Sequence, residues 1–253
     1  MFEFLKGGQN KFIGIDFGTS SIKVVELSYK NQRSYLENYG IVELNLESQG
    51  VQHQLIKNQS FEQKLNLALK TLLEKMKITS GSAYVSIPGF AGLITLIDLP
   101  EMKEDELAKA MQFEAHKYIP TSLDEVAMSW EIVSHKLPEN AVDKDIESKK
   151  SKTIKVLLVA APKREIERYD RLISGASLEV SAIELETFPI ARSFVFLVNK
   201  IISKKLNTKV VIGNPWRSIV FDSKVNPAIN ELGASFSVAV GLALRGVEDY
   251  KRK

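Results

Sequence analysis

A short stretch near the start of the chain combines residue types that suit phosphate and magnesium chemistry. Residues 12–27 place two apolar, strand-like runs on either side of a turn that contains Asp16 and Gly18. Glycine tolerates positive φ, so Gly18 is expected to permit the tight reversal. Successive backbone N–H groups after it would form a concavity that attracts anions. The hydroxyl-bearing residues of this turn are Thr19, Ser20 and Ser21.

Asp16 and Lys23 add the two charges that such a site needs. Hard cations prefer carboxylate oxygen and keep their waters, so Asp16 is expected to hold a magnesium ion through water. Lys23 supplies a positive charge for phosphate, although a solvated strand residue is the alternative for it. A carboxylate at a buried strand end is costly unless it is paired, hydrated or bound to metal, which favours a functional Asp16. The alternative for the whole stretch is an ordinary hairpin turn.

Composition sets broad limits on the class of protein. The 253 residues are 44% hydrophobic, which is enough for one or two globular domains. A net charge of +3 is too small to predict nucleic acid as a main partner. The absence of Cys excludes disulfides and thiol chemistry and fits a reducing compartment. Neither a secretory signal nor a bilayer-spanning run is expected, so the sequence predicts a cytoplasmic protein without direct membrane insertion.

Apolar periodicity predicts alternating strands and helices along the chain. Ser60 and Gln63 form a capping box at the start of an amphipathic helix, and Pro120 is expected to stop another helix that opens with acidic residues. The charged stretch 138–152 is interpreted as a mobile loop, with a basic docking site as the alternative. A C-terminal helix rich in small residues is expected to pack tightly on a sheet. The remaining expected strands are 35–46, 83–87, 93–99, 126–132, 154–161 and 180–185.

Several dispersed motifs resemble the PilM family of type IV pilus assembly, within the actin-like ATPase superfamily. Residues 14–27 are similar to the first phosphate motif of that superfamily. Further stretches similar to the PilM family occur in the same order over nearly the whole chain, at 1–6, 86–89, 113–120 and 240–245. The resemblance implies an α/β fold with an actin-like (ribonuclease H-like) core, related to FtsA, and an inserted α+β subdomain.

The resemblance also implies a domain organisation and a nucleotide. A tail would occupy residues 1–11, the core 12–81 and 182–253, and the inserted partner-binding subdomain 82–181. ATP and Mg would bind at the hairpin turn in the intact family. Glu186 lies where related ATPases place a catalytic residue, and a surface Glu that caps the following helix is the alternative. Because a second Asp-x-Gly turn and an internal Gly-Gly turn are missing, much of the second actin-like half is expected to be absent and nucleotide binding is in doubt.

A partner is implied by the same resemblance. PilM-like proteins hold the short cytoplasmic N-terminal tail of PilN, an inner-membrane protein of the same machine, which would recruit the chain to the cytoplasmic face of that membrane. Extended peptides add to sheet edges or lie in apolar grooves. Subdomain core is the alternative for each candidate. The candidate partner-binding residues are Tyr84, Ser86, Ile87, Pro88, Phe113, Tyr118 and Ile119.

Two classes of function remain open at the level of sequence. The first is a scaffold with nucleotide-responsive docking, which also contacts other pilus proteins or itself. The second is an ATP-hydrolysing enzyme of the actin and sugar-kinase superfamily. Such an enzyme needs an acceptor site and a second phosphate-binding half, and the sequence predicts neither. The scaffold is therefore preferred.

Overall fold

The computed structural model describes residues 11–44, 60–79, 81–136, 153–193 and 214–252. The chain divides into two compact units, each described here by itself. The first unit comprises Met1–Pro88 and Arg168–Lys253, and the second comprises Gly89–Glu167. The predicted tail 1–11 and loop 138–152 lie almost wholly outside the described residues. The fold is α/β, as the sequence predicts.

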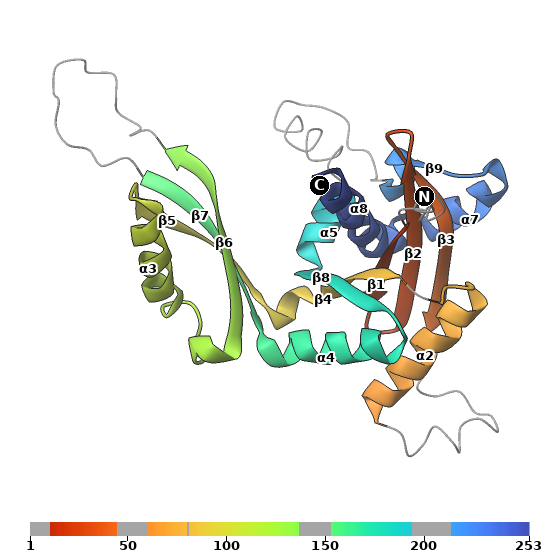
Figure 1. The fold of residues 1–253 in the computed structure, drawn as a ribbon, viewed down its shortest axis with the longest axis horizontal. Helices are drawn as coiled ribbons and strands as arrows, with labels where there is room; N and C mark the ends of the chain where they lie inside the picture. Colours follow the sequence, from red (N-terminus) through yellow and green to blue (C-terminus); the bar gives the residue numbers. More distant parts are fainter. Residues whose placement is uncertain (1–10, 45–59, 80, 137–152, 194–213, 253) are drawn as a thin grey trace, which may run out of the picture. The chain divides into compact units, whose positions relative to one another are not determined.

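A six-stranded sheet forms the centre of the first unit (Figure 1). Its strand order is β8-β4-β1-β2-β3-β9, with antiparallel β1–β2 and β2–β3 pairs and parallel β4–β1, β8–β4 and β9–β3 pairs. The central strands β1, β2 and β4 are buried over nearly their whole length, as in a sheet covered on both faces. The strands are β1 (Lys11–Phe17), β2 (Ser21–Lys30), β3 (Arg33–Glu43), β4 (Ser82–Ile87), β8 (Glu179–Leu185) and β9 (Ile219–Val220).

The C-terminal helix α8 (Ser237–Lys251) covers one face of this sheet, as its small residues predict (Figure 1). A Cβ atom built on Gly14 of β1 would lie 2.0 Å from the carbonyl oxygen of Ala239 in α8. A Cβ atom on Gly241 would lie 1.9 Å from the carbonyl oxygen of Pro189 in α5 (Thr187–Ser193). Side chains at these two positions are therefore excluded by backbone, and glycine permits the close approach of α8 to both β1 and α5.

Two helices cover the opposite face of the sheet. The helix α2 (Phe61–Lys75) begins at the predicted capping box, in which the Ser60 hydroxyl accepts a hydrogen bond from the backbone N–H of Gln63. Its side chains Leu72 and Met76 pack over Gly40 of β3. The helix α4 (Lys163–Gly175) places the ring of Tyr169 5.3 Å from that of Phe17, measured between centroids. The smaller helix α7 (Asn226–Leu232) and the 3₁₀ turn η3 (Pro215–Ser218) complete the unit beside α8.

The second unit is a three-stranded antiparallel sheet with one helix on it. The strand order is β5-β7-β6, and α3 (Glu104–Ala115) covers one face. Alternate residues of β7 are buried against α3 together with Leu107 and Met111, which gives this unit its own core. The strands are β5 (Leu93–Pro100), β6 (Val126–Lys136) and β7 (Thr153–Pro162).

The expected boundaries of the insertion, 82 and 181, are wrong at both ends. β4 pairs in parallel with β1, and β8 pairs in parallel with β4, so residues 82–87 and 179–185 belong to the central sheet. The second unit is therefore Gly89–Glu167. The sequence of a short apolar strand does not show which sheet the strand will join, because its partner strands are far away along the chain.

Membrane crossing by one helix is not found within the described ranges. No single helix there combines the length and apolarity that a bilayer requires, although Ser223–Ile229 and Gly233–Lys251, bent by 101° at their junction, meet those criteria as a pair.

Replacement of Gly14 by alanine tests the close approach of α8 to the sheet. The added methyl group would meet backbone, which cannot rotate away, so we expect the free energy of unfolding to fall by about 3 kcal/mol. This corresponds to a melting temperature lower by roughly 6–12 °C for a protein of this size. Gly40→Ala is the control, because its methyl group meets movable side chains 2.8 Å away. Equal losses in the two variants would contradict the argument.

Candidate functional site

Three parallel strands of the first unit end at one edge of the sheet and bring polar residues together there. Ile15 of β1 lies opposite Val85 of β4, so the residues that follow them, Asp16 and Ser86, are neighbours. The backbone N–H of Glu186, just after β8, donates to the carbonyl oxygen of Ile87 over 2.9 Å. The carboxyl ends of parallel strands are where open α/β sheets bind ligands.

Lys23 completes this cluster from the neighbouring antiparallel strand. The β1–β2 register places Lys23 opposite Asp16. The Lys23 Nζ atom lies 4.0 Å from Asp16 Oδ2, and the side chains are only 15% and 10% exposed. Little water separates the two charges, so the pair interacts more strongly than an exposed pair would. Lys23 is thus a partner of Asp16, as well as a candidate for phosphate.

Ser86 is the residue of this cluster whose role the sequence analysis missed. It was predicted to contact a partner, but its side chain is buried, and Ser86 Oγ donates a hydrogen bond to Asp16 Oδ1 over 3.4 Å. At this length the bond is weak, although it fixes which carboxylate oxygen faces β4. The only sequence signal was a serine between two apolar residues, Val85 and Ile87.

The environment of Asp16 opposes its charge. Burial raises the pKa of the Asp16 carboxyl above its usual value. The Lys23 ammonium and the Ser86 hydroxyl lower that pKa in part, and the negative charge of Glu186 raises it further. A carboxylate held in this way is a candidate for function, because perturbed acids concentrate at functional sites. A bound divalent cation would offset the cost of keeping Asp16 ionised.

The turn between β1 and β2 differs in one respect from the prediction. The Gly18 N–H donates to the Ser21 carbonyl oxygen over 2.9 Å, which closes the turn. Gly18 does not have the positive φ that was expected. Glycine is instead favoured because a Cβ atom would lie 3.1 Å from the Ser21 carbonyl oxygen. Thr19 and Ser20 are exposed at the tip, whereas Ser21 is buried at the start of β2.

These residues fit the metal and phosphate part of a nucleotide. Asp16 supplies carboxylate oxygen, Lys23 a positive charge, and the hydroxyls of Thr19 and Ser20 surface donors. Within the described ranges, no group of three or more His, Asp or Glu side chains is arranged to hold a metal by itself. A magnesium ion here would therefore depend on one carboxylate, water and the phosphates of its ligand, which is the usual arrangement for this ion.

The predicted partner-binding residues separate into two groups. Tyr84, Ser86 and Ile87 lie in β4 and are buried, with at most 6% of each residue exposed, so the prediction that they line a groove of the insertion is wrong. Pro88 ends the first unit and is half-buried.

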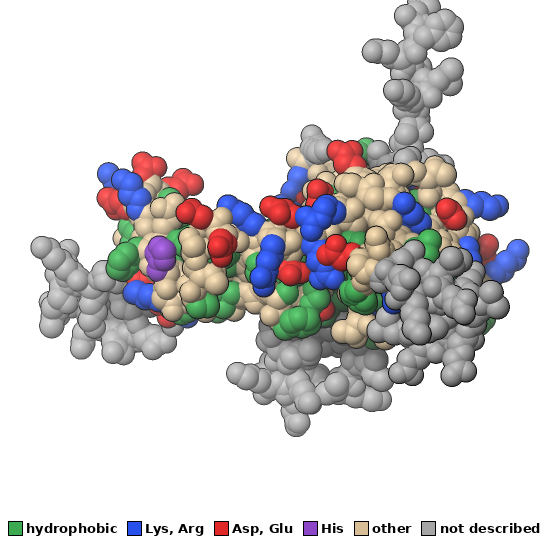
Figure 2. Space-filling view, turned by 90° about the horizontal axis from the view of Figure 1, so that it is seen from below, with side chains coloured by type: hydrophobic (Ala, Val, Ile, Leu, Met, Phe, Trp, Pro, Cys, Tyr) green, Lys and Arg blue, Asp and Glu red, His purple; other side chains and the backbone are tan. Residues whose placement is uncertain are grey.

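Of the three predicted partner-binding residues in the second unit, one is buried and two are exposed. Ile119 is buried in the core beneath α3, so it is not available to a partner. Phe113 and Tyr118 are 70% and 42% exposed, and Lys117 lies over the Phe113 ring at 5.7 Å. On the face shown in Figure 2, acidic and basic side chains are intermixed over both units. That pattern does not favour a polyanion such as nucleic acid.

Comparison with known proteins finds one matching family and a solved structure of similar fold. A model of the family described as type IV pilus assembly protein PilM matches residues 14–201, more than half of the chain. A solved structure described as the PilM-PilN type IV pilus biogenesis complex is similar with a TM-score of 0.66 and 18% identity, over 93% of this chain and 98% of the other.

More distant likenesses do not extend the argument. The cytoplasmic domain of EpsL, an inner-membrane component of the type II secretion system of Vibrio cholerae, gives a TM-score of 0.42 with 11% identity, over 71% of this chain and 58% of the other. A Bacteroides thetaiotaomicron protein with an actin-like ATPase fold gives 0.33 with 14% identity, over 79% of this chain and 60% of the other.

Asp16→Asn is expected to stabilise the protein in metal-free buffer. The native pKa of Asp16 is raised, so the protonated carboxyl favours the folded state below the unfolded pKa of about 3.9, and this contribution is lost as pH rises through the native value. The neutral amide avoids the loss. The variant should therefore melt at a higher temperature than the parent, and this difference should be larger at pH 7 than at pH 4. Each kcal/mol of difference in the free energy of unfolding corresponds to about 2–4 °C. A variant less stable than the parent at pH 7 would contradict the burial argument.

Proposed function

Because the chain belongs to the family of type IV pilus assembly protein PilM, we propose that it is a scaffold that docks the cytoplasmic N-terminal tail of PilN. The observation that carries the proposal is the family match over residues 14–201. The likeness in fold to a chain of the PilM-PilN complex supports it. Docking to an inner-membrane protein would hold this chain at the cytoplasmic face of that membrane.

The second unit offers exposed apolar side chains for such a tail. Phe113 is 70% exposed near the end of α3, and Tyr118 follows it at 42%. Large aromatic side chains at this exposure cost free energy in water and recover it when a partner covers them. The Lys117 ammonium lies 5.7 Å from the Phe113 ring centroid and is paired with Glu114, so the rim of this surface is polar. We place the tail on this surface, defined by Phe113 and Tyr118.

An alternative surface lies on the other side of the same unit. Ile97 and Leu99 of β5 face the buried core, so Leu96 faces away from α3, and it is 53% exposed opposite Leu157 of β7. Strands β5 and β6 also form the two edges of the three-stranded sheet, where an extended peptide can pair. The two surfaces can be distinguished by substitution.

The cluster around Asp16 supports the second part of the proposal, in which nucleotide influences docking. Magnesium bound to ATP would supply positive charge against the phosphates. Asp16 would orient the hydrated ion, Lys23 would compensate phosphate charge, and Thr19 and Ser20 would donate hydrogen bonds from the tip. Ser86 would keep the Asp16 carboxylate in one orientation. These residues bind and orient, which is sufficient for a ligand-responsive scaffold.

Hydrolysis of ATP is the alternative function, and Glu186 is the observation that favours it. Burial is the main cause that raises the pKa of Asp16, and the negative charge of Glu186 adds to it, so the two acids lie near one another. A carboxylate there can orient a water molecule or accept its proton. We propose scaffolding as the main role and, at most, slow turnover.

Substitution of Phe113 tests the docking surface. Phe113→Glu places a charge where the tail is proposed to bury a ring, so the dissociation constant for a synthetic PilN tail should rise at least tenfold, which is 1.4 kcal/mol. Isothermal titration calorimetry measures this change. Leu67→Glu is the matched control, because Leu67 is a 47% exposed helix residue of the first unit. If Leu96→Glu weakens binding and Phe113→Glu does not, the tail has been placed on the wrong face.

Titration with ATP tests the nucleotide part. We expect weak binding that requires magnesium and falls about tenfold in Asp16→Asn, because the ion loses its carboxylate. Sustained phosphate release that disappears in Glu186→Gln would favour the enzyme over the scaffold. Binding that survives Asp16→Asn unchanged would show that the β1–β2 turn is not the site.

A further inference from the structure

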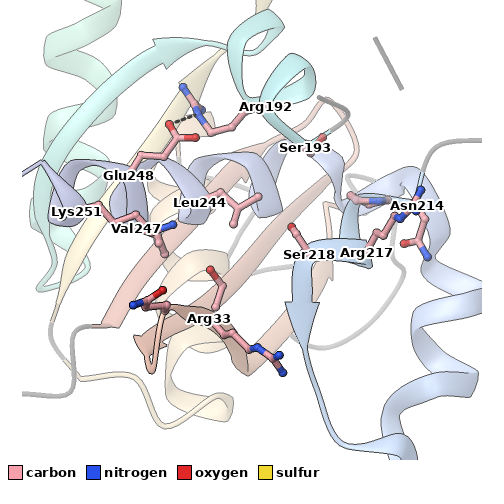
Figure 3. Close-up of a pocket in the computed structure, with 13 residues that line it drawn as sticks. Arg33, Arg192, Ser193, Asn214, Arg217, Ser218, Leu244, Val247, Glu248 and Lys251 are labelled. Carbon is pink, nitrogen blue, oxygen red and sulfur yellow. Dashed lines mark hydrogen bonds and ion pairs between the residues drawn. The ribbon is translucent and has the colours of Figure 1, made fainter. Parts of the chain in front are cut away.

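A second candidate site lies in the first unit, between the β2–β3 turn, the end of α5 and the last turns of α8 (Figure 3). It is a pocket of about 380 Å³, within the lower part of the range of small-molecule pockets. Lys23 marks the Asp16 end of β2, and Lys30 precedes the β2–β3 turn that borders the pocket. Seven residues of strand separate them, which is roughly 20 Å. None of the residues that line the pocket belongs to the cluster around Asp16, although Arg192 on its wall pairs with Glu184, the register partner of Ser86.

Four segments surround this pocket and make its wall positive. The β2–β3 turn contributes Arg33, the end of α5 contributes Arg192, and the last turns of α8 contribute Glu248 and Lys251. The residues Asn214–Ser218, around η3, form the remaining side. Figure 3 shows side chains of these segments on different sides of one hollow. Glu248 is the only carboxylate among the described lining residues.

Glu248 and Arg192 neutralise each other in the wall, so the positive charge of the pocket comes from Arg33 and Lys251. Its carboxylate accepts a hydrogen bond from Arg192 Nε over 3.1 Å, drawn as a dashed line in Figure 3. Arg192 also donates to both oxygens of Glu184, over 2.7 and 3.2 Å, and to the Gly241 carbonyl oxygen over 3.1 Å. Arg33 and Lys251 form no ion pair with any carboxylate of the described residues. Their two charges are available to an anion.

One charge of the wall and the backbone of the β2–β3 turn are also restrained before any ligand binds. The Lys251 ammonium lies over the Tyr29 ring at 4.7 Å, which limits where that charge can move. Asn31 and Gln32 have φ of 50° and 59°, so the β2–β3 turn is a two-residue reversal that favours glycine at its second position. Gln32 instead adopts this unfavourable conformation and presents an amide to the pocket. Preorganised groups lose little freedom on binding.

We infer that this pocket binds a phosphate monoester or diphosphate group. Arg33 and Lys251 would compensate its charge, and the Gln32 amide and Ser218 hydroxyl would donate hydrogen bonds. The apolar side chains Leu244 and Val247 of α8 would contact the part of the molecule that carries the phosphate. Either a soluble organic phosphate or a phospholipid headgroup supplies this chemistry. The inference does not depend on PilN docking or on the nucleotide proposed at Asp16.

Calorimetry with inorganic pyrophosphate, in buffer containing EDTA, tests the pocket without magnesium. We expect saturable binding by the parent and an affinity at least tenfold lower in the double variant Arg33→Gln/Lys251→Gln. Lys30→Gln/Lys70→Gln is the matched control, because it removes the same charge from the same unit at exposed positions outside the pocket.

Two further measurements make the test decisive. Gln32→Gly should raise the melting temperature and weaken pyrophosphate binding about threefold, a combination that a purely structural role would not produce. In a flotation assay, the parent is tested with phosphatidylglycerol vesicles. The ligand is a lipid headgroup if the parent floats with the vesicles, pyrophosphate releases it from them, and the double variant does not bind them. Absence of saturable binding by the parent would overturn the inference, and so would equal losses in the double variant and its control.

Discussion

The contact between the backbone of α8 and the backbone of β1 is the constraint on which the first unit depends. It exists because Gly14 has no Cβ atom that would meet the Ala239 carbonyl oxygen, and Gly241 in the same way lets α8 approach Pro189 of α5. The contact brings α8 onto the sheet face that also carries Phe12. It also brings Glu248 of α8 within reach of Arg192, which pairs with Glu184 as well. Both candidate sites of this unit are positioned by elements that this contact holds together.

Charge is distributed differently at the two sites, and the difference has a physical reason. Asp16 is enclosed by three strand ends and pays for burial, with partial compensation from Lys23 and Ser86. Arg33 and Lys251 remain exposed, so water and salt weaken their fields. A ligand at Asp16 would relieve an existing cost, whereas a ligand in the second pocket would have to displace solvent from charges that are already hydrated.

Features with local causes could be predicted from the sequence. The capping box at Ser60, the hairpin around Asp16 and the packing of α8 through small residues all follow from neighbouring residues, and the structure confirms them. The membership of β4 in the central sheet could not be predicted, because a run such as 83–87 reads the same in either unit. Ser86 was assigned to the wrong surface for the same reason. The conformation of Gly18 also differed, because close approach can select glycine as strongly as positive φ does.

The place where the second unit joins the chain has a consequence for the order of folding. β4 and β8 pair in parallel although roughly eighty residues intervene between them as the second unit. Within that unit Leu93 lies opposite Ala160, so its folded form brings its own entry and exit close together. If it folds first, the loop that must close to pair β4 with β8 is shortened about fourfold, which lowers the entropic cost by about 1 kcal/mol. Prior folding of the second unit would then favour formation of the part of the sheet that carries Asp16, Ser86 and Glu186.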